Sequence, residues 1–130
     1  MLTPEEAARR HPAPAVTDSK IRRLRLLAAD QNPKIRQAAA SSLHAPIDLY
    51  GTLSRDADAD VRAVVARNES TPCDVLRELA RDDSETVRAW VATNFFAPAD
   101  VMELLADDRS DTVRGLVSWK ARLAREAVAV

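Results

Sequence analysis

The stretch Leu79–Leu104, LARDDSETVRAWVATNFFAPADVMEL, decides the fold of this chain. Moved back by 26 residues, it lies over residues 53–78, LSRDADADVRAVVARNESTPCDVLRE, with its Leu, Asp, Val-Arg, Asn and Pro positions in register. Leu105 begins a further copy, and Leu27 begins an earlier one. So many coincidences at one spacing indicate a tandem repeat. The sequence therefore predicts an architecture in some detail, but it specifies no reaction.

Residues at the same position in successive copies form what we call a column, and two such columns are charged. The aspartates are Asp30, Asp56, Asp82 and Asp108, and the arginines are Arg36, Arg62, Arg88 and Arg114. If the copies stack, arginines of successive copies come close together, so aspartates must lie between them. We expect each Asp to accept hydrogen bonds from the backbone or from Arg at a turn between helices, tying each copy to its neighbour. A ligand site is the alternative interpretation of these two columns.

Each copy has the signals of two short helices. A proline suits the first position of the first helix, which is short enough that part of it is expected to be 3₁₀. A preferred N-cap residue begins the second helix. Asn68 and Asn94 are expected to end second helices in the left-handed conformation. The prolines are Pro46, Pro72 and Pro98, and the N-cap residues are Asn32, Asp58, Ser84 and Ser110.

A single copy cannot bury its apolar side alone, so the copies are expected to stack into an all-α solenoid with a 26-residue period. Residues 1–26 are expected to form N-terminal capping helices, and residues 27–130 to form four repeats within one structural domain. The last repeat, 105–130, is a predicted C-terminal cap. It has Lys120 where Asn is due and Ala124 where Pro is due, so its second helix should run from about Asp111 nearly to Val130.

Composition narrows the class of protein. The chain is 46% hydrophobic and 30% charged, with only two Gly, which favours a helical globular protein. The net charge is −1, without the concentrated basic face that nucleic-acid binding needs. No apolar run approaches the roughly 20 residues of a membrane span, and the start lacks the features of a secretion signal. We expect a cytoplasmic protein without membrane contact.

The second predicted helix of residues 1–26 has a basic outer face. Its cations are Lys20, Arg22, Arg23 and Arg25. A solvated face whose long side chains cover apolar surface is one interpretation. A contact for an acidic partner is the other, and the sequence leaves both open.

One copy carries a specific resemblance. Its pattern of Asp, Val-Arg, Val-Ala, Asn, Pro, Val-Leu, Leu-Ala and Asp resembles the leucine-rich repeat variant, a bacterial α-solenoid similar to HEAT and armadillo repeats. The resemblance covers about residues 27–120 and implies a right-handed superhelix of paired α and 3₁₀ helices without strands. The family's usual unit is slightly shorter, so the extra length is expected in a turn or in the first helix. The pattern is carried by Asp56, Val61, Arg62, Val65, Ala66, Asn68, Pro72, Val75, Leu76, Leu79, Ala80 and Asp82.

Catalytic and metal-binding patterns are missing from the sequence. His11 and His44 have no partner motif, and there is no Gly-rich phosphate loop. One member of the resembled family holds an iron–sulfur cluster through cysteines, which the lone Cys73 does not allow here. The alternating Asp56, Asp58 and Asp60 lack the Gly and Glu of a calcium loop and are interpreted as a helix start. We expect no enzyme activity, no cofactor and no metal.

Apolar columns separate core residues from surface residues. Cys73, Tyr50, Trp90 and Met102 fall in apolar columns and are expected to be core. Phe96 stands where other copies are polar, and Trp119 shares a column with Ser41, Arg67 and Thr93. Exposed aromatic residues mark contact sites, although packing under a terminal helix competes with this interpretation. The predicted interaction surface consists of Phe95, Phe96, Trp119, Arg67 and Thr93.

These features predict a non-catalytic interaction module or scaffold. A neutral helical surface suits a protein or peptide partner better than a phosphate backbone. A nucleic-acid-binding, HEAT-like protein is one alternative, and a self-associating structural repeat protein is another. The expected state is a monomer or a weak homo-oligomer.

Overall fold

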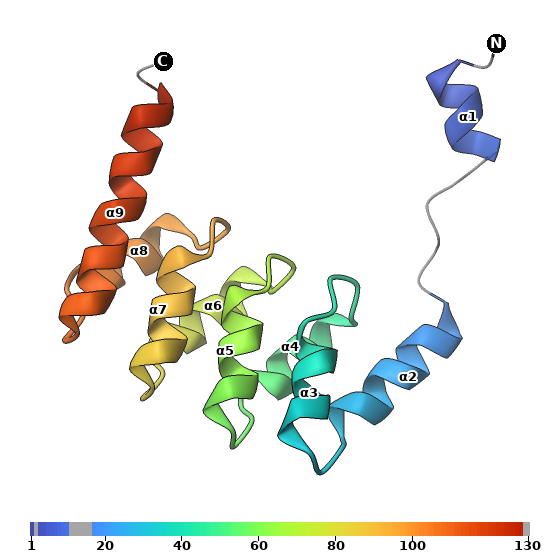
Figure 1. Ribbon diagram of the computed structural model, residues 1–130, viewed down its shortest axis with the longest axis horizontal. Coiled ribbons are helices and arrows are strands. Elements are labelled where there is room, and N and C mark those ends of the chain that lie inside the picture. Colours follow the sequence, from blue (N-terminus) through green and yellow to red (C-terminus); the bar gives the residue numbers. More distant parts are fainter. Residues whose placement is uncertain (2, 11–16, 129–130) are drawn as a thin grey trace.

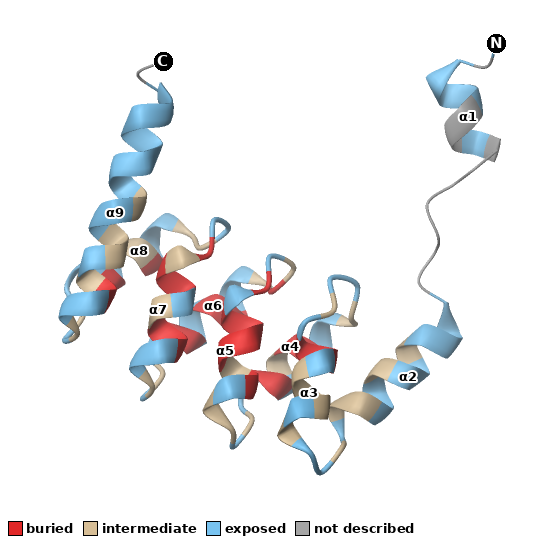
Figure 2. Ribbon diagram, in the orientation of Figure 1, coloured by how far each residue is buried: buried red, intermediate tan, exposed pale blue. Residues whose placement is uncertain are grey.

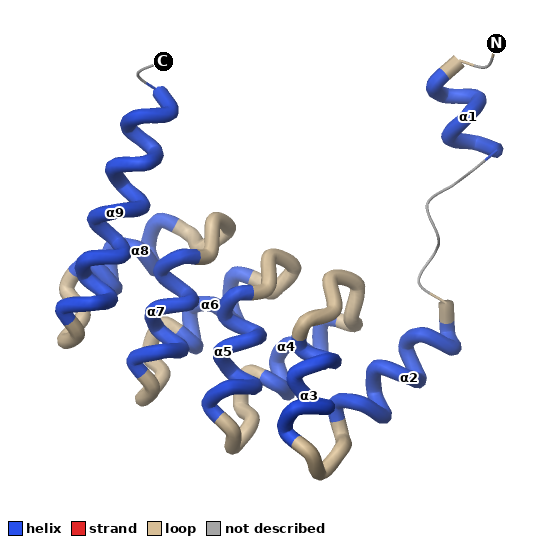
Figure 3. Tube along the Cα trace, viewed as in Figure 1, coloured by secondary structure: helices blue, strands red, loops and turns tan. Residues whose placement is uncertain are grey.

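The computed structural model describes residues 1, 3–10 and 17–128. All regular secondary structure in these residues is helical, and they contain no strand (Figure 3), so the prediction of an all-α fold is confirmed for the described chain. The last helix was predicted to run nearly to Val130, and residues 129–130 lie outside the described residues, as does His11. The helices are α1 (Pro4–Arg10), α2 (Asp18–Ala28), α3 (Pro33–Ala40), α4 (Ile47–Leu53), α5 (Ala59–Arg67), α6 (Cys73–Leu79), α7 (Glu85–Thr93), α8 (Ala99–Ala106) and α9 (Asp111–Val128).

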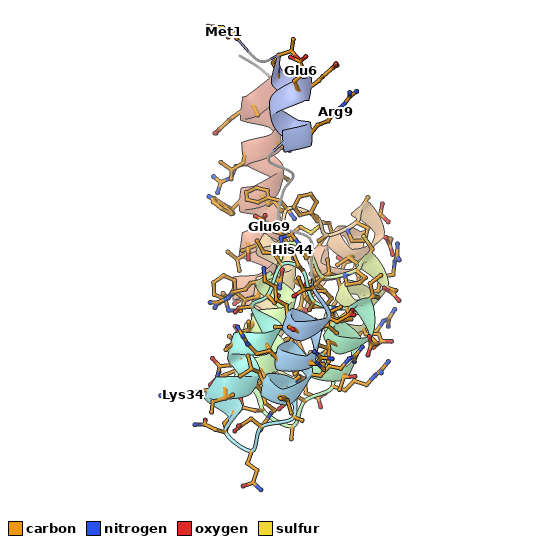
Figure 4. All side chains as sticks on the ribbon, turned by 90° about the vertical axis from the view of Figure 1, so that its right-hand side faces the viewer. Met1, Glu6, Arg9, Lys34, His44 and Glu69 are labelled. Atoms are coloured by element: carbon orange, nitrogen blue, oxygen red, sulfur yellow. The ribbon has the colours of Figure 1, made fainter. Side chains whose placement is uncertain are left out.

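The helices from α3 onward alternate between two layers. Helices α3, α5, α7 and α9 pack side by side in chain order, while α4, α6 and α8 lie behind them and pack on their neighbours along the chain (Figures 1 and 4). At the N-terminal end α2 packs on α3 and α4, and Figure 1 draws α1 away from this packed body. The buried residues lie between the two layers (Figure 2).

The core is built from small and branched side chains at helical spacing. In α5 and α7 the residues Val61, Val65, Val87 and Val91 are fully buried, because each falls on the face turned toward the second layer. Tyr50 is 2% exposed, as expected for a core residue. Its hydroxyl donates to the Ser42 carbonyl at 2.6 Å and so satisfies its one polar group.

Second helices begin where the N-cap column predicts. Asn32 Oδ1 accepts from the Lys34 N–H at 3.0 Å, and Asp58 Oδ1 accepts from the Asp60 N–H at 2.8 Å. The Ser84 hydroxyl accepts from the Val87 N–H, and Ser110 does the same for the start of α9. These side chains satisfy backbone donors that have no partner inside the helix.

The first helices differ from the expectation in two respects. Each is α-helical throughout, without the predicted 3₁₀ part. Their prolines are N-caps rather than first helical residues: Pro46, Pro72 and Pro98 have ψ angles of 143°, 150° and 159°, in the extended range. An extended proline still places its carbonyl to accept the first helical hydrogen bond, as from the Leu76 N–H at 3.1 Å.

The predicted left-handed ends at Asn68 and Asn94 are wrong. Both residues are extended, with φ of −72° in each case, and no described residue, glycine included, has a positive φ. Their side chains explain the difference. The Asn68 amide donates to the carbonyls of Ala40 and Ser42, both at 2.8 Å, in the preceding copy. A left-handed backbone would turn this side chain away from those acceptors.

Helix α9 continues to Val128 because Lys120 cannot make the turn that Asn makes. Asn68 and Asn94 each donate through the amide nitrogen and also accept, through Oδ1, from the N–H two residues later. Lys120 replaces the donor, since its Nζ donates to the Asn94 carbonyl. An ammonium has no acceptor, so nothing closes the turn and the helix runs on, as the sequence predicts.

Candidate interaction surface

The turns after α3, α5 and α7 form one edge of the molecule, which we call the asparagine edge (residues 42–46, 68–72 and 94–98). Figure 4 draws His44 and Glu69 at this edge, above the two layers. Asn94 fixes the third turn: its amide donates to the carbonyls of Ala66 at 2.9 Å and Asn68 at 3.1 Å, and its Oδ1 accepts from the Phe96 N–H at 2.9 Å. The hydrogen bonds that hold this turn therefore come from Asn94.

Phe95 and Phe96 occupy these two positions and lie on the surface. Phe95 is 69% exposed and Phe96 is 58% exposed. The Lys120 Nζ from α9 lies 6.0 Å from the centroid of the Phe95 ring, within the range of a cation–π contact. The same Nζ lies 3.6 Å from the Met102 sulfur, and burial lowers the pKa of Lys120. An aromatic pair thus stands beside a partly desolvated cation.

A second cation lies on an aromatic ring one helix away. The Arg67 guanidinium, at the end of α5, is 5.6 Å from the centroid of the Trp90 ring in α7. A groove of about 310 Å³ runs beside this pair and is lined by Ser41, Leu43, Val64, Arg67, Asn68, Glu69 and Trp90. The guanidinium carbon lies over the ring, and the groove opens beside this pair.

The structure brings the predicted surface residues together only in part. Arg67 is exposed, as is Trp119, which is 42% exposed on α9. Thr93 is half-buried, and its hydroxyl donates to the Trp90 carbonyl at 3.1 Å rather than facing a ligand. No described contact joins Trp119 to Arg67 or to the two Phe residues. The contacts that do form are two, both with rings of α7 or of the turn after it: Arg67 over Trp90, in a groove that Leu43 also lines, and Lys120 over Phe95. We call these residues, together with the exposed Phe96, the aromatic surface: Phe95, Phe96, Lys120, Trp90, Arg67 and Leu43.

Trp90 and Cys73 correct the expectation that apolar columns are buried. Trp90 is 40% exposed; of the other residues in its column only Val64 is buried, while Ala38 is exposed and Leu116 is half-buried, so this position lies at the edge of the core. Cys73 is exposed, and so is Ile47 at 74% in the same column. This column follows the N-cap proline directly, and a side chain there leans over the turn instead of the core. Met102, also expected in the core, is half-buried.

The Asp and Arg columns meet at the opposite edge of the molecule, which we call the ladder edge (residues 54–58, 80–84 and 106–110). Arg36 Nε donates to Asp56 Oδ2 at 2.7 Å, and Arg62 and Arg88 make the same bond to Asp82 and Asp108 at 2.8 Å. Each pair is bidentate, which is the strongest form of this contact. The most enclosed pair is Arg88–Asp108, with side chains 5% and 7% exposed.

Each ladder arginine also binds its own turn. The Nη1 groups of Arg36, Arg62 and Arg88 donate to the carbonyls of Asp30, Asp56 and Asp82, six residues earlier. Arg114 donates likewise to the Asp108 carbonyl and pairs with Asp111 within its own helix.

Two ladder aspartates, Asp56 and Asp108, have a lowered pKa despite their enclosure. Burial alone would raise the pKa of Asp56, but the Arg36 hydrogen bond and the Asp58 N–H outweigh it, so the pKa lies below the usual range. The same balance, with Arg88 and the Ser110 N–H, lowers the pKa of Asp108. Asp58 accepts the Asp60 N–H, as a capped helix start requires, so these acids turn toward backbone donors. Every ladder oxygen is thus occupied by a donor within the fold.

A second set of ion pairs, which joins α2 to α4 and α6 to α8, was not predicted from the sequence. Arg25 pairs with Asp48 at 2.8 Å and Arg77 pairs with Asp100 at 2.9 Å, both between exposed side chains. The signal for the pairing is a recurrent spacing of 23 residues between Arg and Asp, which is three short of the repeat.

The described residues offer no metal centre and no membrane span. They contain no group of three or more His, Cys, Asp or Glu side chains that could hold an ion. No helix among them combines the length and the apolar character needed to cross a bilayer. Comparison of the chain with protein-family models, curated proteins and solved structures finds no match.

Proposed function

We propose that this chain is a non-catalytic α-solenoid of 26-residue repeats, similar to the leucine-rich repeat variant, that binds a protein or peptide on the aromatic surface. The alternation of helices between two layers supports the solenoid, as does the recurrence of one set of hydrogen bonds at Arg36, Arg62 and Arg88. The right-handed superhelix belongs to the same proposal and follows from the resemblance.

One observation carries the binding function: two adjacent Phe side chains lie mostly in water at positions where the other copies have Leu43-His44 and Glu69-Ser70. The turn does not need them, since Asn94 holds it. Burying a Phe side chain contributes about 1.5–3 kcal/mol, and that free energy is available to a partner.

A displayed library of random 12-residue peptides, selected on the immobilised protein, tests this function. Peptides that bind the wild type should lose at least about tenfold in affinity for a Phe95→Ser/Phe96→Ser variant, as expected from two lost aromatic anchors. The matched control is Leu26→Ser/Ile47→Ser, which removes two apolar side chains, each 74% exposed, from α2 and α4. Equal loss in both variants, or in neither, would reject the aromatic surface as the binding site.

Self-association is the other candidate that an observation favours. The end of α9 is exposed from Ala121 to Val128 and includes Leu123 at 37% and Val128 at 86% exposure. Light scattering across a concentration series measures it directly. A mass that stays at one chain rejects this candidate, and a stable dimer that Leu123→Glu dissociates would establish it.

A further inference from the structure

The cations of the aromatic surface differ from the arginines of the two ion-pair sets. Arg36, Arg62 and Arg88 each hold a carboxylate, as do Arg25, Arg55 and Arg77. Arg67 and Lys120 lie on aromatic rings instead, and among the described residues neither has a carboxylate within ion-pair distance. Lys120 is partly desolvated, since burial lowers its pKa, and it has no opposite charge beside it in the described part of the chain. Arg67 is exposed and is free to meet a ligand from the solvent.

These two cations stand on either side of one helix. Arg67 comes from α5 and Lys120 from α9, and both rings belong to α7 or to the turn after it. Helix α7 packs between α5 and α9 (Figure 1). Since packed helices lie about 8–10 Å apart, the two positive charges belong to elements about 16–20 Å apart, with Trp90 and Phe95 between them.

Each cation suits a carboxylate from outside. A guanidinium lying on a ring keeps the N–H groups of its edge available, and a carboxylate can accept two of them in the same plane. The Lys120 ammonium has three donors; one goes to the Asn94 carbonyl and one points to the Met102 sulfur. An incoming carboxylate would restore charge compensation that the fold does not supply.

The surface between the cations is apolar. Trp90, Phe95 and Phe96 offer exposed rings there, whereas Leu43, 56% exposed, extends the apolar surface beyond Arg67, in the turn after α3. Glu69 lines the same groove and is the one acid in it. The pattern of positive, apolar and positive has its complement in a ligand with two carboxylates flanking an apolar side chain.

We propose that the partner of the aromatic surface is an acidic peptide segment, with an apolar side chain against Phe95 and Phe96 and carboxylates on Arg67 and Lys120. This inference rests on the proposed function and specifies its ligand. In an extended peptide, at about 3.3 Å per residue, two acids about four to six residues apart reach both cations.

The peptide library tests the ligand class, because its composition is random before selection. Selected peptides should be enriched in Asp and Glu around an aromatic or aliphatic residue. The best of them, synthesised and followed by fluorescence anisotropy, should bind Arg67→Ala and Lys120→Gln each about fivefold more weakly than wild type. Lys34→Ala, which removes an exposed charge from α3 (Figure 4), is the matched control and should change affinity by less than about twofold.

Two further variants separate a direct contact from a change of fold. Glu69→Gln removes the acid that repels the ligand and should tighten binding about twofold. Lys120→Arg keeps the charge and should bind within about twofold of wild type, which a purely structural role of Lys120 in α9 would not predict. Thermal unfolding of each variant identifies any that has lost its structure.

The outcomes distinguish the two proposals. Selected peptides that need Phe95 and Phe96 but are not acidic would overturn the inference and leave the proposed function standing. Peptides that bind without the two Phe residues would overturn both. Tighter binding of a 20-base-pair DNA duplex than of any selected peptide, abolished by Arg67→Ala, would assign the cations to nucleic acid instead.

Discussion

The turns at the two edges of the molecule are held by the same pattern of side-chain hydrogen bonds, made by Asp at one edge and by Asn at the other. At the ladder edge, Asp accepts the N–H two residues later and binds Arg of the preceding copy. At the asparagine edge, Asn accepts the N–H two residues later and donates to the preceding copy. Each of these turns is thus held by one side chain that closes the turn and also binds the preceding copy. The two sets of turns lie at opposite ends of the packed helices (Figure 1).

The edges differ in what surrounds that side chain. At the ladder edge the charged side chains bind each other. Arg62, for example, donates to both carboxylate oxygens of Asp82 and also to the backbone carbonyl of Asp56. At the asparagine edge the two residues after Ser42, Asn68 and Asn94 make no described ion pair. They change from Leu-His to Glu-Ser to Phe-Phe along the chain. Positions that the fold needs recur between copies, and positions that it does not need are available for a partner.

The largest expected effect is at the ladder edge. Arg88→Ala leaves Asp108 enclosed without its partner and should lower the free energy of unfolding by about 3–5 kcal/mol. Chemical denaturation measures this loss. Arg77→Ala removes an exposed pair of the same chemistry and should leave stability nearly unchanged. Equal midpoints for the two variants would show that enclosure of the ladder contributes nothing.

The second largest loss in the free energy of unfolding is expected at Asn94. Asn94→Ala leaves the Ala66 and Asn68 carbonyls and the Phe96 N–H without their partner, for a cost of about 2–3 kcal/mol. Asn94→Asp retains the acceptor for the Phe96 N–H but faces two carbonyls with a charge, so it should be no better. A full rescue by Asp would mean that only the turn, and not the contact to the preceding copy, stabilises the fold.

Acid should weaken the ladder edge. The pKa values of Asp56 and Asp108 are lowered in the folded state, so their contribution is complete above the unfolded value of about 3.9 and is lost as the pH falls through the folded value. Thermal unfolding should be level from pH 7 to 5 and fall below about pH 4. In Arg88→Ala the enclosed Asp108 has lost the partner that lowers its pKa, so the deficit should shrink on acidification. A deficit that stays constant would contradict this linkage.

The sequence could predict those parts of the fold that depend on local rules or on columns of like residues. N-caps at Asn32, Asp58 and Ser84 follow from the preference of short polar side chains for free N–H groups. The start of α9 at Asp111 follows from the N-cap Ser110, and its length follows from the missing Asn and Pro. The residues of the ladder were identified by their recurrence, but their pairing in register, with Arg binding Asp twenty positions later, needed the structure.

Predictions failed where a partner from another copy decides the outcome. A local rule makes Asn a left-handed helix end, but the carbonyls of Ala40 and Ser42 hold Asn68 extended. The apolar residues of its column predict Trp90 to be a core residue, but its ring lies at the edge of the core, where Arg67 of the preceding copy lies over it. For the candidate site, the exposed Phe95 and Phe96 were predictable, and the two cations beside the rings were not joined to them by any sequence pattern.

The smallest expected effect on stability is at the aromatic surface, and it is the most informative one. Phe95→Ser and Phe96→Ser remove side chains that are 69% and 58% exposed, so each should change the free energy of unfolding by no more than about 0.5 kcal/mol. Peptide binding should fall sharply in the same variants. If the two substitutions instead destabilised the fold as much as Asn94→Ala, the rings would be structural and the asparagine edge would not differ from the ladder edge. A neutral effect on stability with lost binding is what separates a residue kept for a partner from a residue kept for the fold.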